Sequence, residues 1–159
     1  MKPVLISIQP KWCELIASGK KTIEVRKTFP KVNIPFKVYI YCTQGRDNLY
    51  SVNGVVQKLN EIYLDLKQNS IVDELNGKVI GEFVCETVTY AKLGEYCILP
   101  KSKTLIDELD LMDYANGKPL FGWHISNLVI YDKPKELSEL GLTRPPQSWC
   151  YVESEVEGE

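Results

Sequence analysis

The sequence lacks any apolar run near the roughly 20 residues that a membrane-spanning helix needs. Its first residues, 1–5, also lack the long apolar core of a secretion signal. The contents of 44% hydrophobic and 25% charged residues are typical of a soluble globular protein. These features predict a cytoplasmic protein without membrane contact.

The sequence also has little that would bind a metal or form disulfides. Its five cysteines are odd in number and widely scattered, and no two of them have the C-x-x-C spacing of a zinc site. We therefore expect reduced thiols, no metal site and no cofactor.

An excess of positive charge is missing as well. The net charge is −2, and four of the 21 acidic residues lie in the last seven positions. Without these four the chain is slightly basic, far from the basic stripe of many nucleic-acid-binding proteins. The length of 159 residues predicts one domain over residues 1–150, followed by an acidic, flexible tail over 151–159.

Strands and helices are expected in an interspersed order. Alternating and helical spacing of apolar residues predicts strands over 4–8, 22–25, 36–42, 78–90 and 120–131, and helices over 10–18, 55–66, 104–115 and 134–140. Gly81 is expected to permit a bend or a close backbone approach inside its strand. The short connections do not allow regular β-α-β crossovers throughout, so we predict an α+β fold: a small curved barrel of mixed or antiparallel strands with peripheral helices.

The most informative segment runs from Gly19 to Arg26. On a strand through these residues Ile23 and Val25 point to one face, which should be core, while Glu24 and Arg26 point to the other. Lys21, at the junction after Gly19, can join the polar side. Arginine can bind a phosphate bidentately, lysine supplies a point charge, and glutamate accepts from an exocyclic amine, although a solvated charged face is the simpler interpretation.

Gly19-x-Lys21-x-x-Glu24-x-Arg26 resembles the G-x-K-x-x-E-x-R signature of the ASCH family, part of the PUA-like superfamily of small β-barrels. The close match covers roughly residues 4 to 27. The resemblance implies a PUA-like barrel with a cleft over the motif that binds RNA or a modified nucleoside. It therefore favours an RNA- or nucleotide-binding protein with Lys21, Glu24 and Arg26 in the cleft; the sequence indicates no protein partner.

An enzymatic alternative follows from the same resemblance. Some relatives hydrolyse amides on acylated cytidine with a lysine, a threonine and an acidic residue, and another relative is described as a ribonuclease. Lys21 matches the lysine, but Glu24 stands where the threonine belongs, so hydrolysis would need another nucleophile, such as water activated by Glu24. The second acid is open among Glu82, Glu86 and Glu95. A non-catalytic interaction module is a third alternative.

Further candidates for ligand contact lie on other predicted strands. Ser7, Tyr41 and His124 are expected as weaker contributors to the cleft. His124 is the chain's one histidine and either does acid–base work or is held by a local hydrogen bond. Among the aromatic residues, Tyr39 and Tyr41 are open to base stacking and Trp12 favours the core. Trp149 either covers the barrel or lines the cleft.

Overall fold

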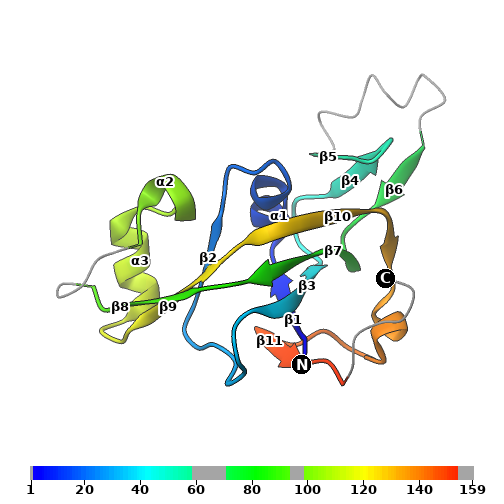
Figure 1. Cartoon of the computed structure of the whole chain (residues 1–159). Helices are drawn as coiled ribbons and strands as arrows, with labels where there is room; N and C mark the ends of the chain where they lie inside the picture. The colour runs from blue at the N-terminus through cyan, green and yellow to red at the C-terminus, as the bar shows by residue number, and fades with distance from the viewer. Residues whose placement is uncertain (1, 59–70, 94–98, 154–159) are drawn as a thin grey trace.

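The computed structural model describes residues 2–58, 71–93 and 99–153. Figure 1 shows a central five-stranded sheet with smaller sheets and helices around it. The order of the large sheet is β10 (Ser126–Lys135), β7 (Lys78–Cys85), β3 (Phe36–Cys42), β1 (Val4–Ile8) and β11 (Trp149–Tyr151). β1 runs parallel to β3, and the other neighbours are antiparallel.

Two three-stranded sheets flank the large one. One has the order β2 (Ile23–Arg26), β9 (Leu120–His124) and β8 (Val88–Ala91), and the other β5 (Val55–Lys58), β4 (Leu49–Val52) and β6 (Val72–Glu74). The α+β class is thus correct, but none of the described sheets closes into a barrel, so the predicted closed barrel is wrong. The strands predicted over 78–90 and 120–131 are each divided between the five-stranded sheet and the sheet that contains β2. One continuous strand would have joined these two sheets, but the division keeps them separate.

The first helix follows its sequence signals. α1 (Pro10–Ala17) has proline in its first turn, where the missing N–H costs nothing, and Gly19 follows it at φ +82°, a conformation that glycine adopts without strain. Cys13 and Ile16 of α1 pack into the core with β1 and β3. α2 (Lys101–Thr104) and α3 (Glu108–Ala115) precede β9, and a 3₁₀ helix, η3 (Leu137–Leu140), ends at Gly141.

The helix predicted from Val55 is wrong where the structure describes it. Asn53 and Gly54 both have positive φ, as in the tight turn that joins hairpin strands, so Val55–Lys58 pairs with β4 as a strand. The rest of the predicted helix lies outside the described residues. No helix within the described ranges is long and apolar enough to cross a membrane.

The last strand brings the C-terminal segment onto the N-terminal one. β11 pairs antiparallel with β1, and Val152 is buried and donates its N–H to the carbonyl of Pro3 at 2.9 Å. Val152 is therefore packed against the start of the chain. This pairing places residues 145–148 beside the start of the chain and beside β2.

Candidate functional site

A cavity of about 550 Å³ lies over the Gly19–Arg26 segment. Its walls come from β1, α1, β2, the end of β3, α3 and the segment before β11. The lining residues are Ser7, Gln9, Trp12, Lys21, Glu24, Val25, Arg26, Tyr41, Thr43, Gln44, Ile106, Leu111, Tyr114, Pro145, Pro146 and Gln147. The volume is within the range of about 300–1,000 Å³ that small-molecule sites occupy.

Strand alternation places the charged residues of β2. Ile23 and Val25 pack in a cluster with Leu111 and Ala115 of α3, while Glu24 and Arg26 lie on the opposite side. After Gly19 the chain turns, and the N–H groups of Lys20 and Lys21 both bond to the carbonyl of Leu15. This turn brings Lys21 to the same cavity wall as Glu24 and Arg26.

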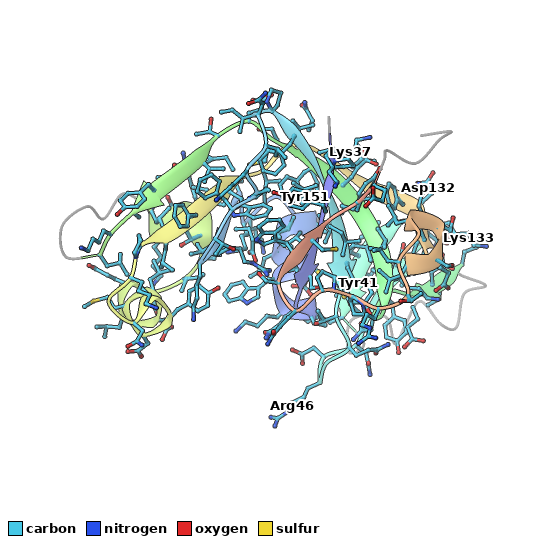
Figure 2. All side chains as sticks on the ribbon, turned by 90° about the horizontal axis from the view of Figure 1, so that it is seen from below. Lys37, Tyr41, Arg46, Asp132, Lys133 and Tyr151 are labelled. Carbon is cyan, nitrogen blue, oxygen red and sulfur yellow. The ribbon has the colours of Figure 1, made fainter. Side chains whose placement is uncertain are left out.

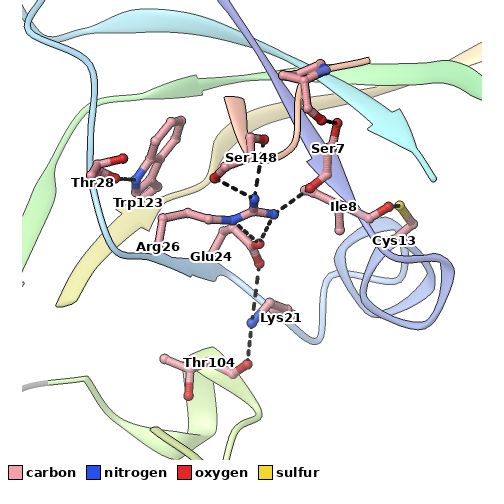
Figure 3. Close-up of polar contacts among 11 residues, drawn as sticks. Ser7, Ile8, Cys13, Lys21, Glu24, Arg26, Thr28, Thr104, Trp123 and Ser148 are labelled. Carbon is pink, nitrogen blue, oxygen red and sulfur yellow. Dashed lines mark hydrogen bonds and ion pairs between the residues drawn. The ribbon is translucent and has the colours of Figure 1, made fainter. Parts of the chain in front are cut away.

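Arg26 organises the site through hydrogen bonds within the protein (Figure 3). Nε and Nη2 donate to Oε2 of Glu24 at 2.9 and 2.6 Å, and Nη2 also donates to the carbonyl of Ser7 at 2.7 Å. Nη1 donates to Oγ of Ser148 at 3.1 Å and to its carbonyl at 3.4 Å. These are five hydrogen bonds, as many as the guanidinium has N–H donors. Arg26 therefore joins β2, β1 and the C-terminal segment.

Lys21 is the most deeply buried charged residue of the site, at 1% exposure. Its ammonium donates to the carbonyl of Thr104 at 2.5 Å, lies 3.7 Å from Oε1 of Glu24 and 4.7 Å from the ring centre of Trp12. Burial lowers the pKa of Lys21, and the Glu24 carboxylate opposes this effect. Lys21 is thus a desolvated donor at the wall of the cavity.

Glu24 stands between the two cations and is itself buried, at 5% exposure. One oxygen accepts twice from Arg26, and the other lies near Lys21. Both oxygens of the carboxylate are therefore turned toward cations of the protein itself. This arrangement favours a structural or ligand-orienting role for Glu24 over activation of water.

Two of the weaker candidates do line the cavity. Ser7 donates its hydroxyl to the carbonyl of Pro146 at 2.7 Å, which fixes the C-terminal wall. Tyr41 is buried at the cavity wall, and burial, followed by the effect of Cys42, raises the pKa of its phenol. Tyr39 is fully buried in the same core cluster as Tyr41 but, unlike Tyr41, is absent from the cavity lining.

His124 is not part of the cavity. Its Nε2 makes a 2.7 Å hydrogen bond with Oγ1 of Thr89. This is the local hydrogen bond that the sequence offered as the alternative to acid–base work in the cleft. Burial, and then the charge of Lys103, lowers the pKa of His124 from its ordinary value of 6.5. The reason is topological: β9 pairs with β2 but directs His124 toward β8.

Trp12 and Trp149 take different positions relative to the cavity. Trp149 packs edge-on against Trp123, with ring centres 6.0 Å apart, and donates to Oγ1 of Thr28, so it covers the core instead of lining the cavity. Trp12 contacts the core, as predicted, but also lines the cavity.

Several lining residues were not predicted from the sequence. Gln9 follows β1, Gln44 follows β3, Gln147 precedes β11, and Tyr114 lies on α3. They are far apart in sequence and share no motif, so no pattern links them. Of the candidate second acids, Glu82 pairs with Lys37 at 3.4 Å, and neither Glu82 nor Glu86 lines the cavity; Glu95 lies outside the described residues.

Metal ligands are not gathered anywhere in the part of the chain that the structure describes. It contains no group of three or more histidine, cysteine, aspartate or glutamate residues placed to hold an ion. The described chemistry of the site is therefore that of two cations, one carboxylate, amides, hydroxyls and aromatic rings.

The sequence and the fold of this chain were compared with those of known proteins. No protein-family model matches the sequence, and no curated protein does. Among solved structures, the chain is similar to the ASCH protein of Zymomonas mobilis, at 19% identity and TM-score 0.63 over 96% of this chain and 89% of that one. A tyrosine-to-phenylalanine variant of the same protein gives 19% identity and TM-score 0.66 over 97% and 92%. The chain thus shares its fold with these ASCH structures, in agreement with the resemblance seen in its sequence.

Proposed function

We propose that this protein binds RNA or a free nucleotide by holding one nucleotide unit in the central cavity. The observation that carries the proposal is the convergence, in one cavity of about 550 Å³, of a buried ammonium, aromatic rings and side-chain amides. The ASCH fold supports it, because the resemblance of the Gly19–Arg26 motif implies RNA or nucleoside recognition.

The amides and rings suit a nucleobase. Gln9, Gln44 and Gln147 each offer a donor and an acceptor, the combination with which glutamine reads a base edge. Trp12, Tyr41 and Tyr114 provide π-faces, and a base stacked on such a ring gains about 1–3 kcal/mol. A purely aliphatic ligand would leave the three amides without partners.

The charged residues suit a carbonyl oxygen of that base. Lys21 and Arg26 outnumber Glu24, so the group has an excess of one positive charge in a buried setting. The donors of Arg26 are occupied by the protein, whereas Lys21 has three donors and one hydrogen bond to Thr104. Lys21 is therefore the residue that meets the ligand, and Arg26 is a positioning residue.

Hydrolysis of a modified nucleoside is the second candidate, and the lowered pKa of Lys21 is the observation in its favour. The pairing of both Glu24 oxygens with cations weighs against water activation by that carboxylate. Binding without turnover is therefore the preferred function.

The test uses Lys21→Met with Lys20→Met as its control. Both changes remove one lysine charge, but Lys21 is buried at the cavity wall whereas Lys20 is exposed on the neighbouring turn. The probes are the four ribonucleosides and their monophosphates. Their binding is measured by calorimetry and by the shifts of backbone amide signals in NMR spectra. Loss of a charged hydrogen bond predicts about a tenfold or greater drop in affinity for Lys21→Met. Lys20→Met should change it less than about twofold.

Two results would count against the proposal. Equal affinities in the two variants would remove Lys21 from the site, and an absence of shifts at residues 19–26 with every probe would reject nucleotide binding itself. Release of acetate from N4-acetylcytidine by the wild type, lost in Lys21→Met, would instead establish the hydrolase. Melting temperatures of both variants separate loss of binding from loss of folding.

A further inference from the structure

A second cavity, of about 320 Å³, adjoins the first. It is lined by Gln9, Pro10, Lys11, Thr43, Gln44, Gly45, Arg46 and Asp47. Three of these residues, Gln9, Thr43 and Gln44, also line the central cavity. The two cavities therefore share a wall of polar side chains, so one extended ligand can occupy both.

The chemistry of the second cavity differs from that of the first. The central cavity has three aromatic residues in its lining, whereas the second has none. Lys11 and Arg46 contribute two positive charges against the single carboxylate of Asp47. A small polar cavity with an excess of positive charge favours an anionic group over a second base.

The loop that carries Arg46 is attached to the rest of the protein at both ends. Thr43 donates its N–H to the carbonyl of Ile8 at 3.0 Å, and Gly77 donates to the carbonyl of Cys42 at 2.7 Å. The buried side chain of Asn76 accepts from the N–H of Leu49 and donates to the carbonyl of Asp47, both at 2.8 Å. Figure 2 shows Arg46 extending outward from this loop. The two ends of the loop are thus held in place by the rest of the protein.

Trp12 connects the two charge groups. The ammonium of Lys11 lies 4.5 Å from the centre of its ring, and that of Lys21 lies 4.7 Å from the same centre. The indole ring is therefore a shared neighbour of one cation of the second cavity and one cation of the central cavity. A ligand whose base contacts Trp12 would have its anionic end within reach of Lys11.

From this placement we infer that the second cavity is a phosphate subsite, which takes the phosphate of the nucleotide whose base lies in the central cavity. The inference rests on the proposed nucleotide binding and adds a specificity to it. The protein discriminates nucleotides from nucleosides through Lys11 and Arg46, and Thr43, on the wall shared by the two cavities, lies along the sugar. In an RNA chain the same subsite takes the phosphate that links the bound unit to its neighbour.

The experiment compares each ribonucleoside with its 5′- and 3′-monophosphates by calorimetry at low ionic strength. The variants are Lys11→Gln, Arg46→Gln and the double variant, with Lys20→Gln and Arg144→Gln as controls for the loss of exposed charges elsewhere. In the wild type we expect about a tenfold preference for one monophosphate over its nucleoside. The double variant should lose this preference with the nucleoside affinity unchanged within about twofold, and the controls should keep it.

The outcomes separate this inference from the proposed function. Nucleoside binding without any preference for a monophosphate, or a preference that survives in the double variant, overturns the phosphate subsite alone. If neither nucleosides nor monophosphates bind, the phosphate subsite and the proposed nucleotide binding are both rejected. Amide shifts at residues 45–47 caused by the monophosphate and absent with the nucleoside support the subsite. An additional arm with inorganic phosphate alone shows whether the anion binds there without its base.

Discussion

Replacement of Arg26 by lysine is the sharpest test of the architecture of the site, because it keeps the charge and removes the planar fork. An ammonium at the end of a lysine can keep the ion pair with Glu24, but it cannot also reach both Ser7 and Ser148. The three hydrogen bonds to these two residues would be lost. The charge on this wall of the cavity would stay the same.

The magnitude follows from the bonds that are lost. Each of the three hydrogen bonds contributes about 1 kcal/mol net to the free energy of unfolding. Arg26→Lys should therefore lower the free energy of unfolding by about 3 kcal/mol. For a domain of this size this corresponds to a fall in melting temperature of roughly 6–12 °C.

The assay is urea unfolding followed by tryptophan fluorescence. Trp149 directly follows Ser148 and packs on Trp123, so it reports on the attachment of the C-terminal segment. Ser148→Ala, which removes only the bond to Oγ, should cost about 1 kcal/mol. Arg144→Lys is the control, since Arg144 is exposed and its replacement should change stability by less than about 0.5 kcal/mol. If Arg26→Lys and Arg144→Lys proved equally stable, the assignment of Arg26 as the residue that joins three segments would be refuted.

Two further predictions concern residues outside the central cavity. A Cβ at Gly81 would lie 2.4 Å from the carbonyl oxygen of Val129, so Gly81→Ala should lower the free energy of unfolding by about 2–3 kcal/mol. Gly45→Ala is the control, because its Cβ would make an ordinary 3.5 Å contact and should lower the free energy of unfolding by less than about 0.5 kcal/mol. Equal losses of the two variants in urea unfolding would contradict this prediction. The imidazole of His124 should titrate with a midpoint below pH 6.5 when followed by NMR. Because the unfolded state then binds more protons than the native state, the free energy of unfolding should fall as the pH drops from 6.5 toward the lower pKa of the native state. A midpoint at or above 6.5, or the same fall in the His124→Gln variant, would exclude this contribution of His124.

The sequence by itself determined the local structure of the motif. Pro10 and Gly19 mark the two ends of α1, and the alternation of Ile23 and Val25 with Glu24 and Arg26 sets which residues face the core. These are effects of backbone conformation and of side-chain period, which act over a few residues and are therefore visible in the chain. The expectation that Gly81 permits a close backbone approach belongs to the same kind, and the carbonyl of Val129 beside it confirms it.

Only the tertiary structure decided how the site is completed. The two hydrogen bonds from Arg26 to Ser148 depend on the pairing of β11 with β1, which brings together residues 122 positions apart in sequence. The same folding brings Gln9, Gln44 and Gln147 to one cavity and leaves His124 bonded to Thr89 outside it. No local periodicity encodes these distances, because strand order and the division of long strands between sheets depend on packing of the whole chain. The charged motif was readable in the sequence, but only the fold decides whether each charged side chain faces the cavity or bonds to another group of the same chain.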